Sequence, residues 1–151
     1  MITIKNTQRT IKIPATHVKK IITQILEKLG YQNFDIGIWF TTNKTIKKYN
    51  KQYRKNDKPT DILSFAYHAD ATPEQKIKVA TPEDANLGDL IISAEYIART
   101  ARSFDTPFNE HLDMILVHGI CHLIGHDHES TRDYQKMARL ENNLKLLLSH
   151  K

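Results

Sequence analysis

Three histidines, His118, His122 and His128, constrain the fold of this chain more than any other feature of its sequence. His118 and His122 are four residues apart, so on a helix their imidazoles project from one face, about one turn apart. At that separation, two ring nitrogens can bind one metal ion. Gly125 is the natural position for the chain to leave the helix in a left-handed conformation and turn back. His128 would then supply a third nitrogen, so the spacing predicts a metal site at the end of a helix.

The order H-x3-H-x2-G-x2-H is also that of the extended zinc-peptidase signature, in which a glutamate follows the first histidine. This chain has Gly119 at that position. The carboxylate that activates water for peptide hydrolysis is therefore missing, although the ligand spacing is kept. The spacing favours zinc, and Gly119 argues against a peptidase.

Residues around the motif have more than one interpretation. His111 shares a helix face with His118, but we interpret it as a half-exposed histidine and not as a ligand. His126 is either a proton carrier or a turn residue. Asp127 either orients an imidazole through its second nitrogen or forms an Asx-turn. Cys121, the one cysteine, cannot form an internal disulfide, and we expect it to point into the core, away from the metal.

Composition sets further bounds. A chain of 151 residues, 40% of them hydrophobic, can bury a core of its own, and we expect one domain covering residues 1–151. The longest aliphatic run is short, from Met114 to Val117, and residues 1–10 are too polar for a signal segment. We therefore expect a cytoplasmic protein without membrane spans. The net charge of +5, with lysine clusters in residues 44–48 and 51–58, favours an anionic partner without deciding for nucleic acid.

Hydrophobic periodicity predicts the order of helices and strands. Alternating isoleucines between residues 2 and 13 suit one or two short strands, and further strands are expected over residues 34–41, 62–67 and 86–92. Helices are expected over residues 15–29, 43–53, 94–104, 107–123 and 131–148, with Tyr53 and Phe104 on buried faces. The segment from His68 to Ala85 is expected to be a mobile excursion and not a domain linker.

Two further segments share a pattern with the histidine motif. The motif His118-Gly119-x-x-His122-Leu123-x-Gly125-x-Asp127-His128 occurs together with Tyr53-Arg54-x-x-Asp57-x-Pro59-Thr60-Asp61-Ile62-Leu63-Ser64-Phe65 and Leu87-Gly88-Asp89. In this combination the chain closely resembles the bacterial rRNA-maturation endoribonuclease family known as YbeY, from about Tyr31 to its end. Two positions depart from the family pattern, since His126 replaces a usual tyrosine and Cys121 a usual leucine. Neither is a ligand position.

This resemblance implies a single-strand-specific metallo-endoribonuclease that acts on ribosomal RNA ends and on defective ribosomes. It implies one zinc ion on His118, His122 and His128, and a functional arginine that matches Arg54. Taken alone, Arg54 is better interpreted as a solvated charge at a helix end, and the resemblance reverses that preference. The implied partners are ribosomal RNA and the small ribosomal subunit, with no membrane and no DNA. The implied fold is α+β, a small mixed sheet packed with helices and a zinc-peptidase-like histidine-bearing helix.

Two other functions stay open on the sequence. One is a zinc metallopeptidase-like hydrolase, favoured by the ligand spacing and opposed by Gly119. The other is a non-catalytic ribosome-assembly factor in which zinc only stiffens the fold. A fourth coordination position that protein ligands leave open would favour an enzyme over a structural zinc site.

Overall fold

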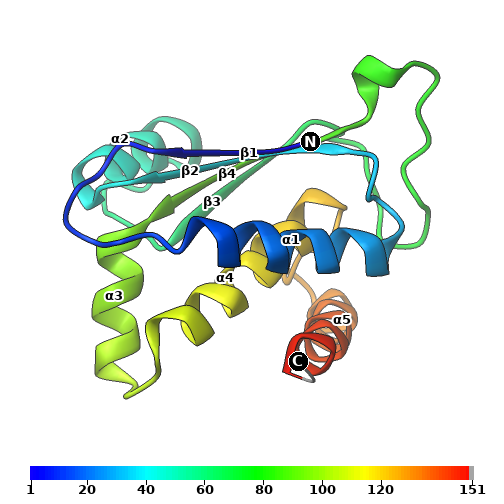
Figure 1. Ribbon diagram of the computed structural model, residues 1–151. Coiled ribbons are helices and arrows are strands. Elements are labelled where there is room, and N and C mark those ends of the chain that lie inside the picture. The colour runs from blue at the N-terminus through cyan, green and yellow to red at the C-terminus, as the bar shows by residue number, and fades with distance from the viewer. Residues whose placement is uncertain (150–151) are drawn as a thin grey trace.

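A four-stranded sheet forms the centre of the structure (Figure 1). The computed structural model describes residues 1–149. Strands β1 (Ile2–Asn6), β2 (Asp35–Thr41) and β4 (Asn86–Ser93) are parallel, while β3 (Ile62–Ala66) pairs antiparallel with β4. The strand order is β1-β2-β4-β3, so β3 is an edge strand. The predicted class, an α+β fold with a mixed sheet packed with helices, is confirmed.

Helices lie on both faces of this sheet, but unevenly (Figure 1). α1 (Ala15–Leu29), α3 (Ala94–Ser103), α4 (Phe108–Leu123) and α5 (Thr131–Ser149) lie below the sheet in this view, and α2 (Asn43–Arg54) lies above one end. A short 3-10 turn, η1 (Pro82–Asp84), precedes β4. The upper face beside α2 is therefore left open. Within residues 1–149, no helix combines the length and the apolar character needed to cross a membrane.

Side-chain alternation along the strands divides the apolar residues between the two faces. Alternate residues of β2, from Ile36 to Phe40, point into the main core between the sheet, α1 and α4. On the other face, a smaller cluster of Ile46, Leu63 and Ile91 joins α2 to β3 and β4. The strands therefore contribute side chains to two separate regions. One is the face covered by α1, α3, α4 and α5, where the histidines lie, and the other is the face beside α2.

Local signals begin and end several helices where the sequence predicted. Thr42 Oγ1 accepts a hydrogen bond from the Thr45 N–H at 3.3 Å at the start of α2. Ser93 Oγ accepts from the Tyr96 N–H at 3.3 Å at the start of α3. Gly30 follows α1 with a φ of 81°, in the left-handed region.

Of residues 1–14, Ile2–Asn6 form a strand, which agrees with the expectation of one or two short strands. After this strand the buried Gln8 side chain bonds both backbone groups of Ile11, donating at 2.7 Å and accepting at 2.9 Å. Two other expected details differ in the structure. Tyr53 was predicted to be buried but is 51% exposed, since the last turn of α2 extends over the open part of the sheet. Phe104, also predicted to be buried, is 71% exposed because α3 ends at Ser103 and the chain turns there.

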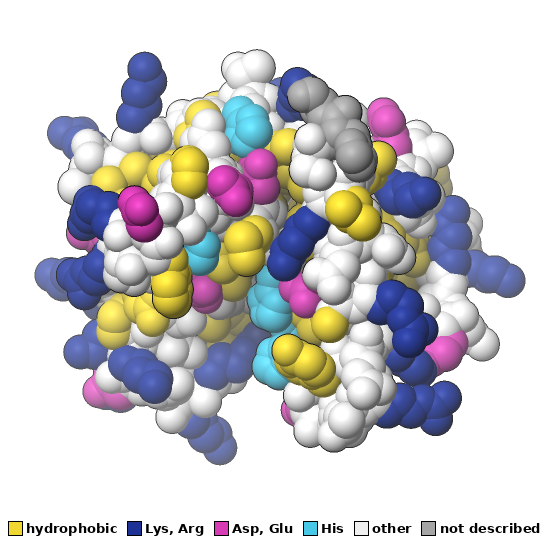
Figure 2. All heavy atoms as spheres, turned by 90° about the horizontal axis from the view of Figure 1, so that it is seen from below, with side chains coloured by type: hydrophobic (Ala, Val, Ile, Leu, Met, Phe, Trp, Pro, Cys, Tyr) yellow, Lys and Arg dark blue, Asp and Glu magenta, His cyan; other side chains and the backbone are white. Residues whose placement is uncertain are grey.

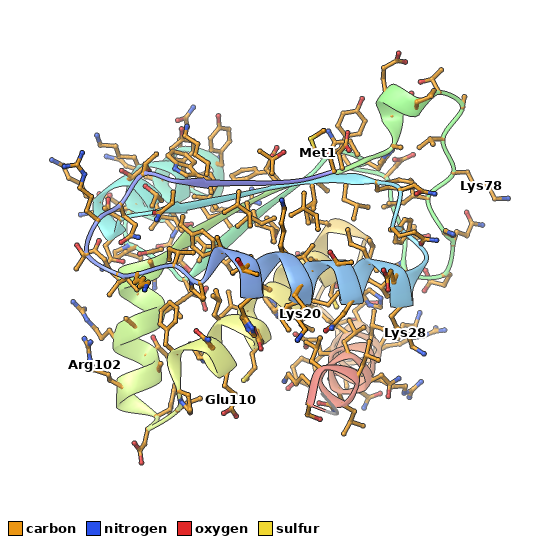
Figure 3. All side chains as sticks on the ribbon, in the orientation of Figure 1. Met1, Lys20, Lys28, Lys78, Arg102 and Glu110 are labelled. Atoms are coloured by element: carbon orange, nitrogen blue, oxygen red, sulfur yellow. The ribbon has the colours of Figure 1, made fainter. Side chains whose placement is uncertain are left out.

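The excursion between β3 and β4 lies against the rest of the fold at several points. The Ile77 N–H donates to the Tyr31 hydroxyl at 2.9 Å, and Ile77 and Val79 pack against the main core. Glu74 forms an ion pair with Lys136 of α5. Lys78, by contrast, lies on the outer side of this segment (Figure 3). These contacts place residues 71–74 beside the turn that follows α4.

Candidate metal centre

Helix α4 is packed into the core on most sides, which leaves one partly exposed side for His118 and His122. Leu116, Val117 and Ile120 are completely buried around the two histidines. This packing makes α4 a rigid support for the two imidazoles. Their Nε2 atoms lie 3.1 Å apart, so the predicted pairing of His118 and His122 on one helix face is confirmed.

Gly125 turns the chain back toward the histidines, as predicted. The Gly125 N–H bonds the His122 carbonyl at 3.1 Å and the His126 N–H bonds the Cys121 carbonyl at 3.0 Å, the two bonds of a Schellman motif. Gly125 has a φ of +103°, and a Cβ there would lie 2.5 Å from the Ala71 carbonyl oxygen. Both the conformation and the close approach of the 68–85 segment therefore require glycine at this position.

His128 completes a group of three imidazoles. Ring nitrogens of His118, His122 and His128 all lie within 4.8 Å of one another. Figure 2 shows histidine side chains gathered in a hollow of the helical face, with an acidic side chain beside them. Two nitrogens bound to one tetrahedral zinc ion at 2.0–2.1 Å would be about 3.3 Å apart, close to the spacing of His118 and His122. The three histidines could therefore hold a metal ion.

Hydrogen bonds on the far side of the rings direct two of the ligand nitrogens inward. His118 Nδ1 lies 2.9 Å from Glu141 Oε2 of α5, and His122 Nδ1 lies 2.9 Å from the His126 carbonyl oxygen. A carbonyl can only accept, so Nδ1 of His122 donates and its Nε2 presents a lone pair. If the Glu141 carboxylate likewise accepts from His118, two lone pairs face each other at 3.1 Å. That arrangement repels unless a cation lies between them, which fits a metal site.

The charges of the surrounding groups agree with this role. Burial, and repulsion from His118, lower the pKa of His122, which keeps its imidazole neutral and able to bind a metal at neutral pH. Burial by itself raises the pKa of the Glu141 carboxyl, but the hydrogen bond from His118 and the nearby positive charges outweigh it, so the pKa lies below its usual value. Burial raises the pKa of the Cys121 thiol to about 12. Cys121 is completely buried, as predicted for a core residue.

The structure also gives the contacts of the neighbouring residues. Asp127 Oδ1 accepts from the Glu129 N–H at 3.2 Å, the geometry of an Asx-turn. His126 contributes its backbone carbonyl to the site, by orienting His122. Burial lowers the pKa of the His126 side chain. His111 is partly buried and stands outside the three-histidine group, as expected.

Gly119 packs directly against the sheet. A Cβ at this position would lie 2.5 Å from Ile62 Cδ1 and 3.0 Å from Leu90 Cδ2. The Gly119 carbonyl accepts a hydrogen bond from Ser64 Oγ at 3.3 Å. The position that carries the peptidase glutamate therefore faces β3 and β4, and a side chain there would have to displace the ends of the Ile62 and Leu90 side chains.

Arg54 reaches the edge of the sheet from the last residue of α2. Its Nη2 donates to the Ser64 carbonyl at 2.8 Å, and its guanidinium carbon lies 5.1 Å from the centre of the Phe65 ring. Because the Ser64 hydroxyl bonds Gly119, one strand residue links Arg54 to the helix of the histidines. Arg54 itself is exposed and does not belong to the group of histidines.

Glu141 is the site residue that sequence reasoning missed. It lies four residues after the buried Met137 and three before the buried Leu144, within the apolar stripe of α5. A carboxylate inside such a stripe is costly unless it has a partner. The position of Glu141 inside an apolar stripe was therefore the one sign in the sequence that this glutamate has a buried partner. Nothing in the sequence indicated that the partner is His118.

The chain is similar to proteins of one family over nearly all of its length. The family described as endoribonuclease YbeY matches residues 3–148. Endoribonuclease YbeY of Homo sapiens is 35% identical over 138 residues, which is 91% of this chain and 82% of that protein. The protein of the same name from Petrotoga mobilis is 34% identical over 143 residues, 93% of this chain and 90% of that protein.

A solved structure shares the fold. The solution structure of TM1509 from Thermotoga maritima superimposes with a TM-score of 0.55 at 22% identity, covering 95% of this chain and 89% of the other. At that identity, the likeness concerns the fold alone. The family match and the extent of the sequence similarity lead to the conclusion that this chain belongs to the endoribonuclease YbeY family.

Proposed function

We propose that this protein is a zinc-dependent endoribonuclease that cleaves single-stranded RNA, with His118, His122 and His128 as the zinc ligands. The observation that carries the proposal is the orientation of the imidazoles, two of which are held by hydrogen bonds that turn Nε2 inward. The names of the relatives support hydrolysis of RNA. From the resemblance to the family, the activity serves rRNA maturation and ribosome quality control on the small subunit, in a single cytoplasmic domain of residues 1–151.

Three histidines are the donor set of catalytic zinc sites, whereas structural zinc sites are closed by four protein ligands. Among residues 1–149, the group that could hold an ion consists of three histidines. Zinc bound there would supply Lewis acidity and would lower the pKa of a water molecule to about 7. This donor set favours an enzyme over an assembly factor that uses zinc only for stability.

Arg54 is the residue that we assign to the RNA phosphate. Its one short hydrogen bond, to the Ser64 carbonyl, involves a single N–H of the guanidinium and holds the side chain at the edge of β3. A guanidinium has five N–H donors in a planar fork that matches a phosphate, so further donors remain for substrate. There the positive charge would stabilise negative charge that grows on the phosphate during cleavage.

The peptidase alternative finds no support. The chain has glycine where a zinc peptidase has its glutamate base, and this position packs against Ile62 and Leu90 of the sheet. The hydrolase we propose instead acts on a phosphodiester, for which the positive charge of Arg54 is suited.

The test combines a metal assay with cleavage of labelled RNA. Protein loaded with zinc should cleave a single-stranded RNA and spare the same sequence in a duplex. His122→Ala should lose both zinc and activity, while Arg54→Ala should keep zinc and lose activity. The proposal fails if zinc-loaded protein leaves single-stranded RNA intact, or if His122→Ala retains full cleavage.

A further inference from the structure

An open cavity of about 430 Å³ lies on the sheet face opposite the histidines, beside α2. Its size falls within the range of about 300–1,000 Å³ that is usual for ligand sites. Gly37 forms part of its floor, because β2 has no side chain at this position to fill the space between the neighbouring strands. The cavity is far more aromatic than the chain as a whole, in which aromatic residues make up 8%.

Four aromatic rings follow one another along the wall of this cavity. Trp39 of β2 meets Tyr49 of α2 edge-on at 5.5 Å between ring centres, and Tyr49 stacks on Tyr53 at 6.0 Å. Tyr53 in turn meets Phe65 of β3 at 5.2 Å. The Trp39 indole is held by a hydrogen bond of 2.8 Å from its Nε1 to Thr7 Oγ1. With Tyr53 half-exposed, this row presents flat apolar surface to solvent from three different elements.

Cations stand at both ends of the aromatic row. Lys5 Nζ lies 4.8 Å from the centre of the Trp39 ring, and the guanidinium of Arg54 lies over Phe65. The neighbouring helix α2 adds further lysines, of which Lys47, Lys48 and Lys51 are exposed. A carboxylate, Asp89, lies over Gly37 at the floor of the cavity. It would repel a phosphate inside the cavity, so an anionic polymer would keep its phosphates on the rim.

We propose that this cavity binds a base of single-stranded RNA by stacking, while Lys5 and the lysines of α2 hold the adjoining phosphates. Aromatic surface for bases beside cations for the backbone is the combination by which proteins bind single strands without reading their sequence. The choice of RNA over a protein partner follows from the positive rim, which would repel a basic peptide. The assignment of RNA as the bound polymer rests on the proposed function.

The position of Arg54 connects this cavity with the histidine site. β3 is the edge strand, and Arg54 bonds the Ser64 carbonyl while its guanidinium lies over Phe65. Ser64 directs its hydroxyl to α4 on the other face, whereas Phe65 lines the cavity. A single-stranded RNA that passes round this edge of the sheet would contact Arg54 between the cavity and the histidine site. The cavity therefore serves as a second hold on the substrate, separate from the residues that cleave it.

Trp39 is the one tryptophan of the chain and reports directly on the cavity. Zinc-loaded protein is titrated with a short single-stranded RNA carrying phosphorothioate linkages, whose integrity is checked by electrophoresis. Trp39 emission and the anisotropy of an end-labelled copy of the RNA are followed together. The variants are Tyr53→Ala and Phe65→Leu, from two different elements, and the control is Phe104→Ala, which removes an exposed aromatic side chain outside the cavity.

RNA should quench Trp39 saturably, with the same Kd by both signals. Tyr53→Ala and Phe65→Leu should each raise Kd at least about 5-fold, with unchanged zinc content, and Phe104→Ala should leave it unaltered. If wild-type protein cleaves RNA while Trp39 stays silent and both variants bind normally, the cavity assignment is overturned and the proposed function stands.

Other outcomes separate the two ideas further. Quenching that depends on Tyr53, without cleavage by zinc-loaded protein, would support the cavity and refute the proposed function. Quenching by a basic peptide and not by RNA would overturn the cavity proposal and assign this face to a protein partner.

Discussion

Replacing Glu141 tests whether the group behind His118 tunes metal binding. Glu141 Oε2 lies 2.9 Å from His118 Nδ1, with 19% of the glutamate side chain exposed. Removing the carboxylate should free the imidazole to rotate and should remove a negative charge near the ion. Both effects weaken binding, and loss of such a partner commonly costs about 10–100-fold in metal affinity.

The electrostatic part can be worked from the geometry. A zinc ion about 2.1 Å beyond Nε2 would lie roughly 7 Å from the carboxylate oxygen. Attraction between charges of +2 and −1 at this distance is about 1 kcal/mol at the dielectric constant of water, and about 5 kcal/mol at an effective value of about 20. The partial exposure of the pair places the effect between these limits. We therefore expect Glu141→Ala to bind zinc about 100-fold more weakly, and Glu141→Gln, which keeps an acceptor, about 10-fold more weakly.

The measurement is a competition between the protein and a chromophoric zinc chelator at fixed pH and ionic strength. Glu129→Gln is the matched control, since it makes the same change of charge on an exposed residue beside His128. Its zinc affinity should stay close to that of the wild type. Equal affinities for wild type, Glu141→Ala and Glu129→Gln would refute the role of the hydrogen bond. A weakening shared equally by Glu129→Gln would show that net charge, and not orientation, is responsible.

Three other changes test the remaining assignments. Arg54→Ala should retain its zinc content and melting temperature while cleaving RNA about 100-fold more slowly, a loss of ~3 kcal/mol in transition-state stabilisation. Arg54→Lys should recover only part of the rate. Cleavage by Arg54→Ala at the wild-type rate would exclude Arg54 from the reaction. Gly119→Glu should destabilise the fold by about 1–3 kcal/mol in denaturant unfolding, because the new side chain would meet Ile62 and Leu90. For the same reason it should gain no peptidase activity. Zinc-dependent cleavage of casein by this variant would contradict the packing argument. Charge reversal at Lys47 and Lys51 should flatten the dependence of log K on log salt by about 0.7 for each phosphate that the protein no longer neutralises, and an unchanged slope would place the RNA elsewhere.

Features that depend on a few consecutive residues could be predicted from the sequence. The spacing of His118 and His122 defines one face of a helix, and Gly125 marks the turn that returns His128. Both are local because helix geometry and the left-handed turn are set within one or two turns of chain. The helices with apolar stripes were predictable for the same reason, and Thr42 and Ser93 cap two of them in the structure.

Predictions of burial failed where the outcome depended on what lies opposite a residue. Tyr53 continues the apolar stripe of α2, yet α2 covers only one end of the sheet, so this tyrosine borders an open cavity. Phe104 continues the stripe of α3 by one residue past the point where the helix ends. Periodicity shows which side of a helix is apolar, but not how far its partner extends along it.

The metal motif and its turn were determined by the sequence itself, through spacing. The class of fold was implied by the family resemblance, and the order of elements predicted from periodicity agreed with it. Only the tertiary structure placed Glu141 behind His118, 23 residues away, and showed that Gly119 packs against Ile62 and Leu90 of the sheet. It alone brought Lys5, Trp39 and Phe65 of three strands to one cavity. The difference is physical, since contacts within a turn follow from backbone geometry, whereas contacts between distant segments exist only once the helices and strands pack.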